Sequence, residues 1–139
     1  MRAEEKARNF LARYPGPVPI DLEEMALAEG LEVVEWPYRV LEETFLWPCI
    51  AVRVGLSRVW RRWVIAHALG HHLQHRGNQL WLRQKDDGLR RRQELQAERF
   101  AAWLLMPEEE VSRLHSLDLW TFADHFDVPV ECVSLRFPH

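Results

Sequence analysis

One amphipathic segment, residues 60–75, constrains the fold more than any other part of the chain. Its apolar residues follow the spacing of one helical face and occupy positions 60, 63, 64 and 68, with 65 and 69 widening the face. His67 and His71 lie inside this segment. A helix places residues four apart one turn from each other on the same side. The segment therefore predicts a long helix that carries two candidate metal ligands.

A second long helix is predicted over residues 89–106. It ends there because Pro107 cannot continue it. Glu94 and Glu98 are also four residues apart and share a face. In one interpretation both are solvated acids that pair with nearby arginines for a few tenths of a kcal/mol each, about 0.2–0.5. In the other, Glu94 is a third metal ligand and Glu98 holds a ligand histidine by its other ring nitrogen. Spacing alone slightly favours the solvated acids.

The rest of the chain predicts a small sheet near the N-terminus and short helices near the C-terminus. We expect strands at 31–36 and 49–54, a loop at 77–88, and further helices at 3–13, from Asp21 to Glu29, after Pro107, at 117–126 and at 129–137. No internal repeat and no Gly/Ser linker interrupts this order. The sequence therefore predicts one α+β domain over residues 1–139, with a small N-terminal sheet packed on a mostly helical half.

Composition excludes several classes of protein. With 47% hydrophobic and 28% charged residues the chain is not disordered, and its longest uncharged apolar run, residues 63–69, is too short to span a bilayer. A net charge of −3 argues against a large nucleic-acid-binding surface. The charged first residues do not form a signal-peptide pattern, so the cytoplasm is the expected location. Cys49 and Cys132 are expected to be buried thiols.

Gly70 lies between the two histidines. In a helix interior glycine costs about 1 kcal/mol relative to alanine. Close approach of another element beside the histidines would offset that cost. A tetrahedral zinc site needs a third protein ligand and leaves the fourth position to water. The spacing of the histidines is compatible with such a site, but most histidine pairs at this spacing reflect chance or core packing.

Two stretches, WRRWVIAHALGHHLQH and QELQAERFAAWLLMP, resemble the ImmA/IrrE metallopeptidase family. Members carry a zinc-binding His-Glu-x-x-His helix and, later, a helix that ends in F-A-A-x-L-L-M-P. The similarity continues upstream through PVPIDLEEMALAEGLEVVEWP and downstream through LWTFADHFDVPVECVSLRF. It covers nearly the whole chain and implies a zincin-like domain.

By this resemblance, His67, His71 and Glu94 match the zinc ligands of the family. Glu98 stands where the family usually has Asn or Asp, which puts its role beside a ligand histidine in doubt. His75 matches a histidine often found one turn after the second ligand, as a neighbour of the site.

Ala68 is the departure from the family pattern, because the family has its general-base glutamate at this position. Alanine cannot accept a proton from a zinc-bound water, and loss of a general base costs about 10²–10⁴ in rate. The ligand set itself is unchanged. The sequence therefore predicts a zinc site with hydrolysis absent or strongly reduced, which fits a natural pseudo-enzyme and an inactivated peptidase alike.

Three functions follow from this reading. The chain is a zinc metallopeptidase, natural or silenced at Ala68, or a non-catalytic zinc module that binds a regulator through the substrate cleft, or a metal-free interaction domain. The resemblance implies a protein or peptide as substrate or partner, such as a DNA-binding repressor in stress response and mobile-element control. Neither direct nucleic-acid binding nor membrane association is expected.

Overall fold

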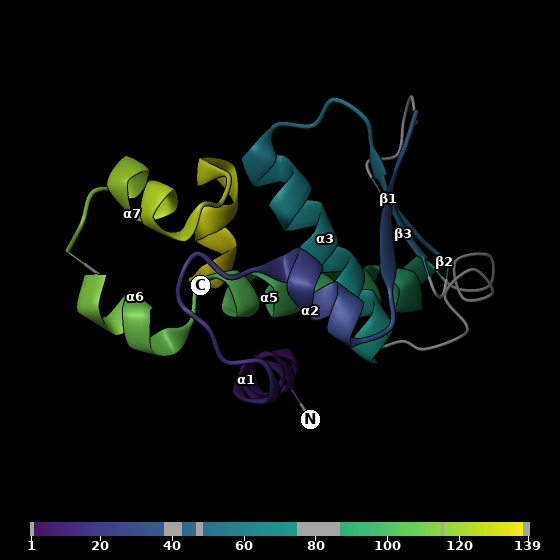
Figure 1. Cartoon of the computed structure of the whole chain (residues 1–139). Coiled ribbons are helices and arrows are strands. Elements are labelled where there is room, and N and C mark those ends of the chain that lie inside the picture. The colour runs from purple at the N-terminus through teal and green to yellow at the C-terminus, as the bar shows by residue number, and fades with distance from the viewer. Residues whose placement is uncertain (1, 38–42, 47–48, 75–86, 115, 138–139) are drawn as a thin grey trace.

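The structure, a computed structural model, describes residues 2–37, 43–46, 49–74, 87–114 and 116–137 (Figure 1). Its elements are, in chain order, α1 (Ala3–Arg13), α2 (Leu22–Ala28), β1 (Glu32–Trp36), β2 (Glu43–Leu46), β3 (Cys49–Arg53), α3 (Arg58–Gln74), α5 (Asp87–Leu105), α6 (Glu108–Leu114), α7 (Leu119–Phe126) and the 3₁₀ helix η1 (Val130–Arg136). This mostly helical chain with one small sheet confirms the predicted α+β class.

The sheet has the strand order β1–β3–β2. Its central strand β3 pairs in parallel with β1, where Val33 is opposite Ile50, and antiparallel with β2. The prediction found β1 and β3 but missed β2, whose four residues are too few to show an alternating pattern. Ile50 and Val52 of β3 are fully buried and belong to the same hydrophobic core as the inner face of α3.

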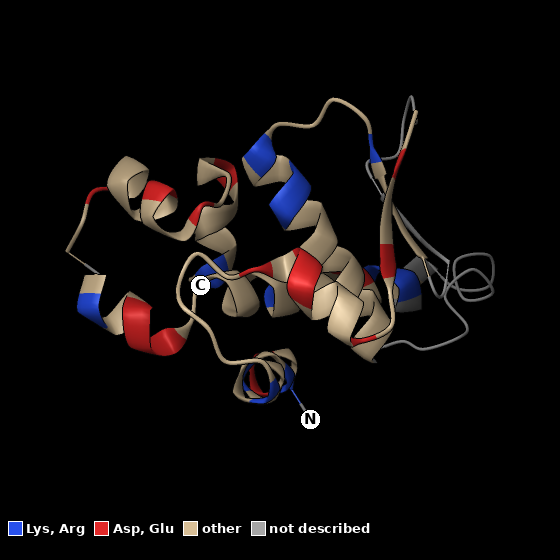
Figure 2. Cartoon of the chain, viewed as in Figure 1, with Lys and Arg blue, Asp and Glu red and all other residues tan. Residues whose placement is uncertain are grey.

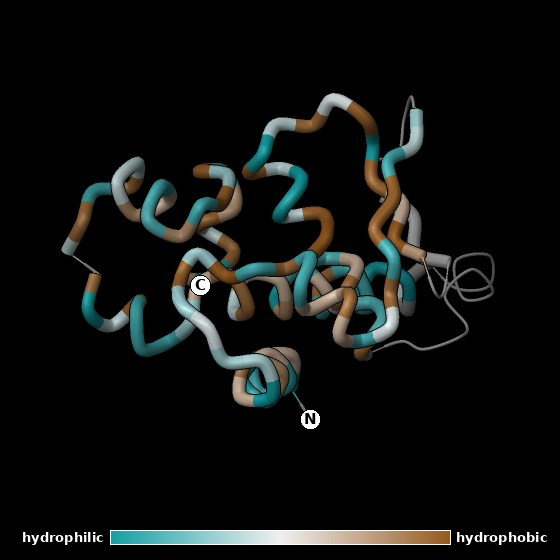
Figure 3. The backbone as a smooth tube through the Cα atoms, viewed as in Figure 1, coloured by the Kyte–Doolittle hydropathy of each residue, from teal (hydrophilic) through white to brown (hydrophobic). Residues whose placement is uncertain are grey.

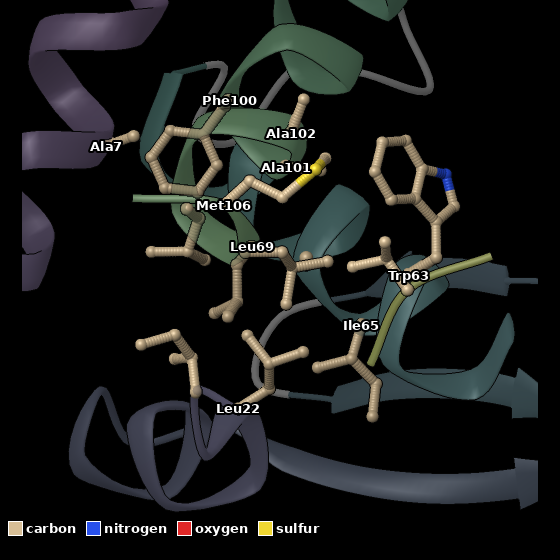
Figure 4. Packing of buried hydrophobic residues seen from close by; sticks show 14 of the residues in the cluster. Ala7, Leu22, Trp63, Ile65, Leu69, Phe100, Ala101, Ala102 and Met106 are labelled. Carbon is tan, nitrogen blue, oxygen red and sulfur yellow. The ribbon is translucent and has the colours of Figure 1, made fainter. Parts of the chain in front are cut away.

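The core is formed mainly where α3 and α5 pack against each other, and α1 packs across α5 (Figure 1). Its fully buried side chains include Ile65 and Leu69 from α3 and Phe100 from α5, seen together in Figure 4. The ring of Phe100 lies 6.1 Å from that of Phe10 in α1. The two long helices predicted from periodicity are thus the centre of the fold.

Most predicted boundaries agree with the structure to within two residues. Asp21 caps α2 as expected, since its side chain accepts a hydrogen bond from the backbone N–H of Glu24 at 3.1 Å. The predicted loop at 77–88 is wrong at its end, because α5 already begins at Asp87. The predicted helix at 117–126 begins instead at Leu119, since Asp118 is its cap. Residues 75–86 lie outside the described part of the chain.

Hydrophobic residues are interspersed with hydrophilic ones along the described helices (Figure 3). Within that part of the chain, no helix is both long enough and apolar enough to cross a membrane.

Candidate metal centre

Three of the residues singled out in the sequence lie together where α3 meets α5. The candidate ligand atoms of His67, His71 and Glu94 are all within 4.8 Å of one another. The Nε2 atom of His67 lies 3.3 Å from one oxygen of Glu94, and that of His71 lies 2.8 Å from the other. Both imidazoles therefore face a single carboxylate on the neighbouring helix.

Gly70 explains how the two helices come so close. A Cβ atom at this position would lie 3.1 Å from the Cα and carbonyl oxygen of Ala97 and 3.1 Å from the ring of Phe100. Two of these contacts are backbone atoms of α5, which cannot move aside as a flexible side chain can. The missing side chain thus lets the turn that carries Glu94 approach the turn that carries both histidines, as the sequence suggested.

The site is enclosed on the side of α3 and open on the side of α5. The side chains of His67 and His71 are 14% and 11% exposed, and that of Glu94 is 48% exposed. Burial by itself raises the pKa of the Glu94 carboxyl, but hydrogen bonds from both imidazoles and their charge outweigh burial and hold this pKa far below its usual range. Glu94 is therefore a carboxylate at neutral pH.

This donor set fits a zinc ion. Two imidazole nitrogens and one carboxylate oxygen are ligands that zinc takes in proteins, at bonds of about 2.0–2.2 Å. Two ligands of a tetrahedral zinc ion are then about 3.3–3.5 Å apart. The nitrogen–oxygen separations of 3.3 and 2.8 Å are close to that spacing, so small side-chain shifts suffice to bring the atoms around one ion.

The other predicted site residues are placed differently. Ala68 follows His67 on α3 and is only 1% exposed, within the hydrophobic core. Glu98 is partly buried one turn after Glu94, but it is not one of the three residues whose ligand atoms converge. The predicted neighbour His75 lies outside the described residues.

A contact that the sequence did not predict anchors α3 beside the site. His72 is 4% exposed, and its Nε2 lies 3.5 Å from a carboxylate oxygen of Glu29, at the end of α2. Glu29 also accepts a hydrogen bond from the hydroxyl of Tyr14 at 2.5 Å and pairs with Arg13. No local pattern marks Glu29, because its partners are 15 to 43 positions away in the sequence.

Comparisons with known proteins relate the chain to a peptidase family and to one solved fold. The sequence model of a peptidase family described as the IrrE N-terminal-like domain matches residues 29–137. Among solved structures, a Mycobacterium tuberculosis transcriptional regulator is similar over 96% of this chain, with a TM-score of 0.72 and 18% sequence identity. At that identity the likeness concerns the fold, and the present chain covers 45% of that protein. No curated protein sequence matches the chain.

Proposed function

Because the chain belongs to the IrrE N-terminal-like domain family of peptidases, which has a zincin-like fold, we propose that it is a zinc-binding regulatory domain with hydrolysis absent or strongly reduced. The observation that carries this proposal is the convergence of His67, His71 and Glu94 at the crossing of α3 and α5. In the metal-free alternative the two histidines are packing residues and Glu94 is their hydrogen-bond acceptor.

In this proposal His67, His71 and Glu94 hold the ion. When bound, zinc would act as a Lewis acid and would lower the pKa of water. The protein contributes the orientation of the ligands, since both histidines project from one helix and Gly70 lets α5 approach it closely. The exposed side of Glu94 leaves a path for a partner to approach.

The reduced activity follows from Ala68. A buried methyl group accepts no proton, so the position beside the first ligand holds no general base. Glu94 does not substitute for it, because its two oxygens face His67 and His71. The domain is then suited to recognising a protein rather than to cutting it rapidly.

For the partner, we propose a protein of transcriptional control, such as a DNA-binding repressor. The support is the fold shared with a protein described as a transcriptional regulator. We also assign the residues before position 29, which precede the matched range, to the same domain, because Phe10 of α1 packs against Phe100 of α5.

Zinc stoichiometry tests the metal part of the proposal. Elemental mass spectrometry of the zinc-loaded protein is expected to find close to one zinc per chain, lost in His71→Ala. The matched control is His125→Ala, a histidine that contacts Glu110 at the other end of the molecule and should keep the zinc. Absence of zinc after incubation with excess metal would overturn the proposal and leave the metal-free interaction domain.

Restoring the missing base tests the catalytic part. Ala68→Glu is expected to raise cleavage of internally quenched peptides by about 10²–10⁴-fold, whereas Ala68→Gln, of the same size but without a base, should not. Adding His71→Ala should abolish the gained activity. If Ala68→Glu folds and binds zinc but cleaves nothing, the substituted residue is not what limits hydrolysis, and the non-catalytic binding module is the better description.

A further inference from the structure

The region from Pro107 to Phe137, which contains α6, α7 and η1 and is called the C-terminal lobe below, differs in charge from the rest of the chain. It carries seven acidic residues and two arginines, a net charge of −5, whereas the whole chain carries −3. The acids are Glu108, Glu109, Glu110, Asp118, Asp124, Asp127 and Glu131. Figure 2 shows acidic residues along both α6 and α7.

Both arginines of the lobe are already paired with its own glutamates. Arg113 binds both oxygens of Glu110, at 2.8 and 2.7 Å. Arg136 is buried, donates to the carbonyl of Met106 at 2.9 Å and pairs with Glu108. Asp127 is paired with Arg58 and Arg62 of α3. Glu109, Asp124 and Glu131 keep the lobe negative at its surface, so it attracts positive charge from another molecule.

The same lobe exposes large apolar side chains at the start of α7. Trp120 is 71% exposed, Leu119 51% and Leu117 37%. Asp124 is also exposed and lies one helical turn after Trp120 on the same face. We call these four residues the Trp120 surface. Exposed apolar side chains that gather on a surface mark interaction sites, and tryptophan is enriched among the residues that contribute most binding energy.

This exposure belongs to a well-formed helix. Phe122, Ala123 and Phe126 are buried on the face of α7 that lies away from Trp120 and Asp124. The side chain of Asp118 caps the helix by accepting hydrogen bonds from the backbone and hydroxyl of Thr121, both at 2.9 Å. The Trp120 surface is therefore held in place by packing on its inner side.

We propose that the Trp120 surface is a docking site for a basic amphipathic segment of a partner protein, one that presents lysines or arginines around apolar side chains. The net charge of the lobe and the apolar side chains at its surface together select this chemistry. The proposal rests on the proposed function only in taking the partner to be a protein. It does not require zinc, because α6 and α7 lie at the end of the molecule away from the sheet and the C-terminal end of α3 (Figure 1).

The test uses a fluorescein-labelled amphipathic helical peptide of leucine and lysine, with its glutamate-for-lysine counterpart as the control ligand. Fluorescence anisotropy is expected to show binding of the lysine peptide only. Trp120→Ala should raise the dissociation constant about tenfold or more, as for a central contact residue. Asp124→Lys should weaken peptide binding about 3–10-fold and reduce the salt dependence of that binding.

Two matched variants separate this surface from the overall negative charge. Trp36→Ala removes another exposed tryptophan, 56% exposed on β1, and Glu32→Lys reverses an exposed acid on the same strand. Both should leave binding within about twofold of the unchanged protein. Equal weakening by either control, no effect of Trp120→Ala and Asp124→Lys, or no binding of the lysine peptide would overturn the proposal.

A second copy of the chain is the competing occupant. Light scattering over a range of protein concentrations should give the same mass for Trp120→Ala and the unchanged protein. A dimer that this variant dissociates would overturn the proposal in favour of self-association. Zinc measured on the same samples separates the two proposals. If the protein binds the lysine peptide but no zinc, only the proposed metal site is contradicted.

Discussion

At the α3–α5 crossing an aromatic residue is fully buried and a glycine lets two backbones touch, whereas on α7 an aromatic residue projects into solvent. Phe100 is 0% exposed and Trp120 is 71% exposed. The first arrangement brings His67, His71 and Glu94 together, and close packing limits how far they can separate. The second leaves its side chains free to meet another molecule. A rigid helix crossing and an exposed helix face suit the two proposed functions, which are holding a metal and binding a partner.

The two regions also use arginine differently. Arg62 of α3 donates to the backbone carbonyls of Asp127 at 2.9 Å and Ile20 at 2.6 Å, which ties α3 to the end of α7 and to the segment before α2. Burial lowers the pKa of this guanidinium, although the charge of Asp127 opposes that effect. Arg113 instead bridges one turn of α6 at the surface. Only the first contact joins distant parts of the chain.

The largest expected difference in the free energy of unfolding is that between the single variants Phe100→Ala and Trp120→Ala. Phe100→Ala should lower the free energy of unfolding by about 3–5 kcal/mol because it opens a cavity in the core. Trp120→Ala should change it by no more than about 0.5 kcal/mol. Urea unfolding followed by circular dichroism measures both. Similar losses for the two variants would mean that Trp120 is packed in solution, against the comparison drawn above.

Arginine replacement should give the next largest difference. Arg62→Gln leaves two buried carbonyl groups short of a donor, and we expect the free energy of unfolding to fall by about 2–3 kcal/mol. Arg113→Gln should cost about 0–0.5 kcal/mol, as for an exposed pair. The same unfolding measurement applies. A negligible effect of Arg62→Gln would show that water replaces its hydrogen bonds.

Gly70→Ala tests the close approach directly. The new methyl group meets the backbone of Ala97, at a cost of about 1–3 kcal/mol, while alanine returns about 1 kcal/mol of helix propensity. We expect a net loss of about 1 kcal/mol together with weaker zinc binding, measured by unfolding and by competition with a chelator. Gly88→Ala, at an exposed position in the first turn of α5, should not destabilise the protein. A more stable Gly70→Ala with unchanged zinc affinity would contradict this account.

The smallest expected effect concerns pH. Burial raises the pKa of Glu29, but the hydrogen bond from Tyr14 and the charges of Arg13 and His72 outweigh it, so the pKa lies below its ordinary value of 4.5. Such a group stabilises the fold above about pH 4.5, and this contribution is lost as the pH falls further. Glu29→Gln should therefore flatten the acid side of the stability profile.

Glu110 provides the comparison in the C-terminal lobe. Hydrogen bonds from Arg113 and His125 also lower the pKa of this carboxyl, but it lies at the surface. Glu110→Gln should change the profile in the same direction, and 1 M salt should remove most of that change. The effect of Glu29→Gln should persist in salt. If salt removes both effects equally, the contacts of Glu29 are as solvated as those of Glu110.

Much of the secondary structure could be predicted from short-range patterns, whereas the three candidate donors are predicted from the resemblance to a family, since spacing alone favours other roles. The cap at Asp21 and the helical repeat of residues 60–75 depend on residues no more than four positions apart, and the structure confirms the cap and the helix as far as Gln74. The spacing of His67 and His71 predicts their common side of α3 for the same reason. Their role as ligands with Glu94 remains a prediction, although the structure brings the three together.

Other features depend on which faces of distant elements meet, and they become visible only in the folded structure. Strand β2 exists through its pairing with β3. Glu29 reaches His72, and Arg62 reaches the backbone of Asp127, 65 positions away. Leu119, Trp120 and Phe122 are all apolar in sequence, yet packing against η1 buries Phe122 and leaves Trp120 outside. Local sequence determines what a segment becomes, because its hydrogen bonds are local. Burial depends on the neighbours, which the chain supplies only when it folds.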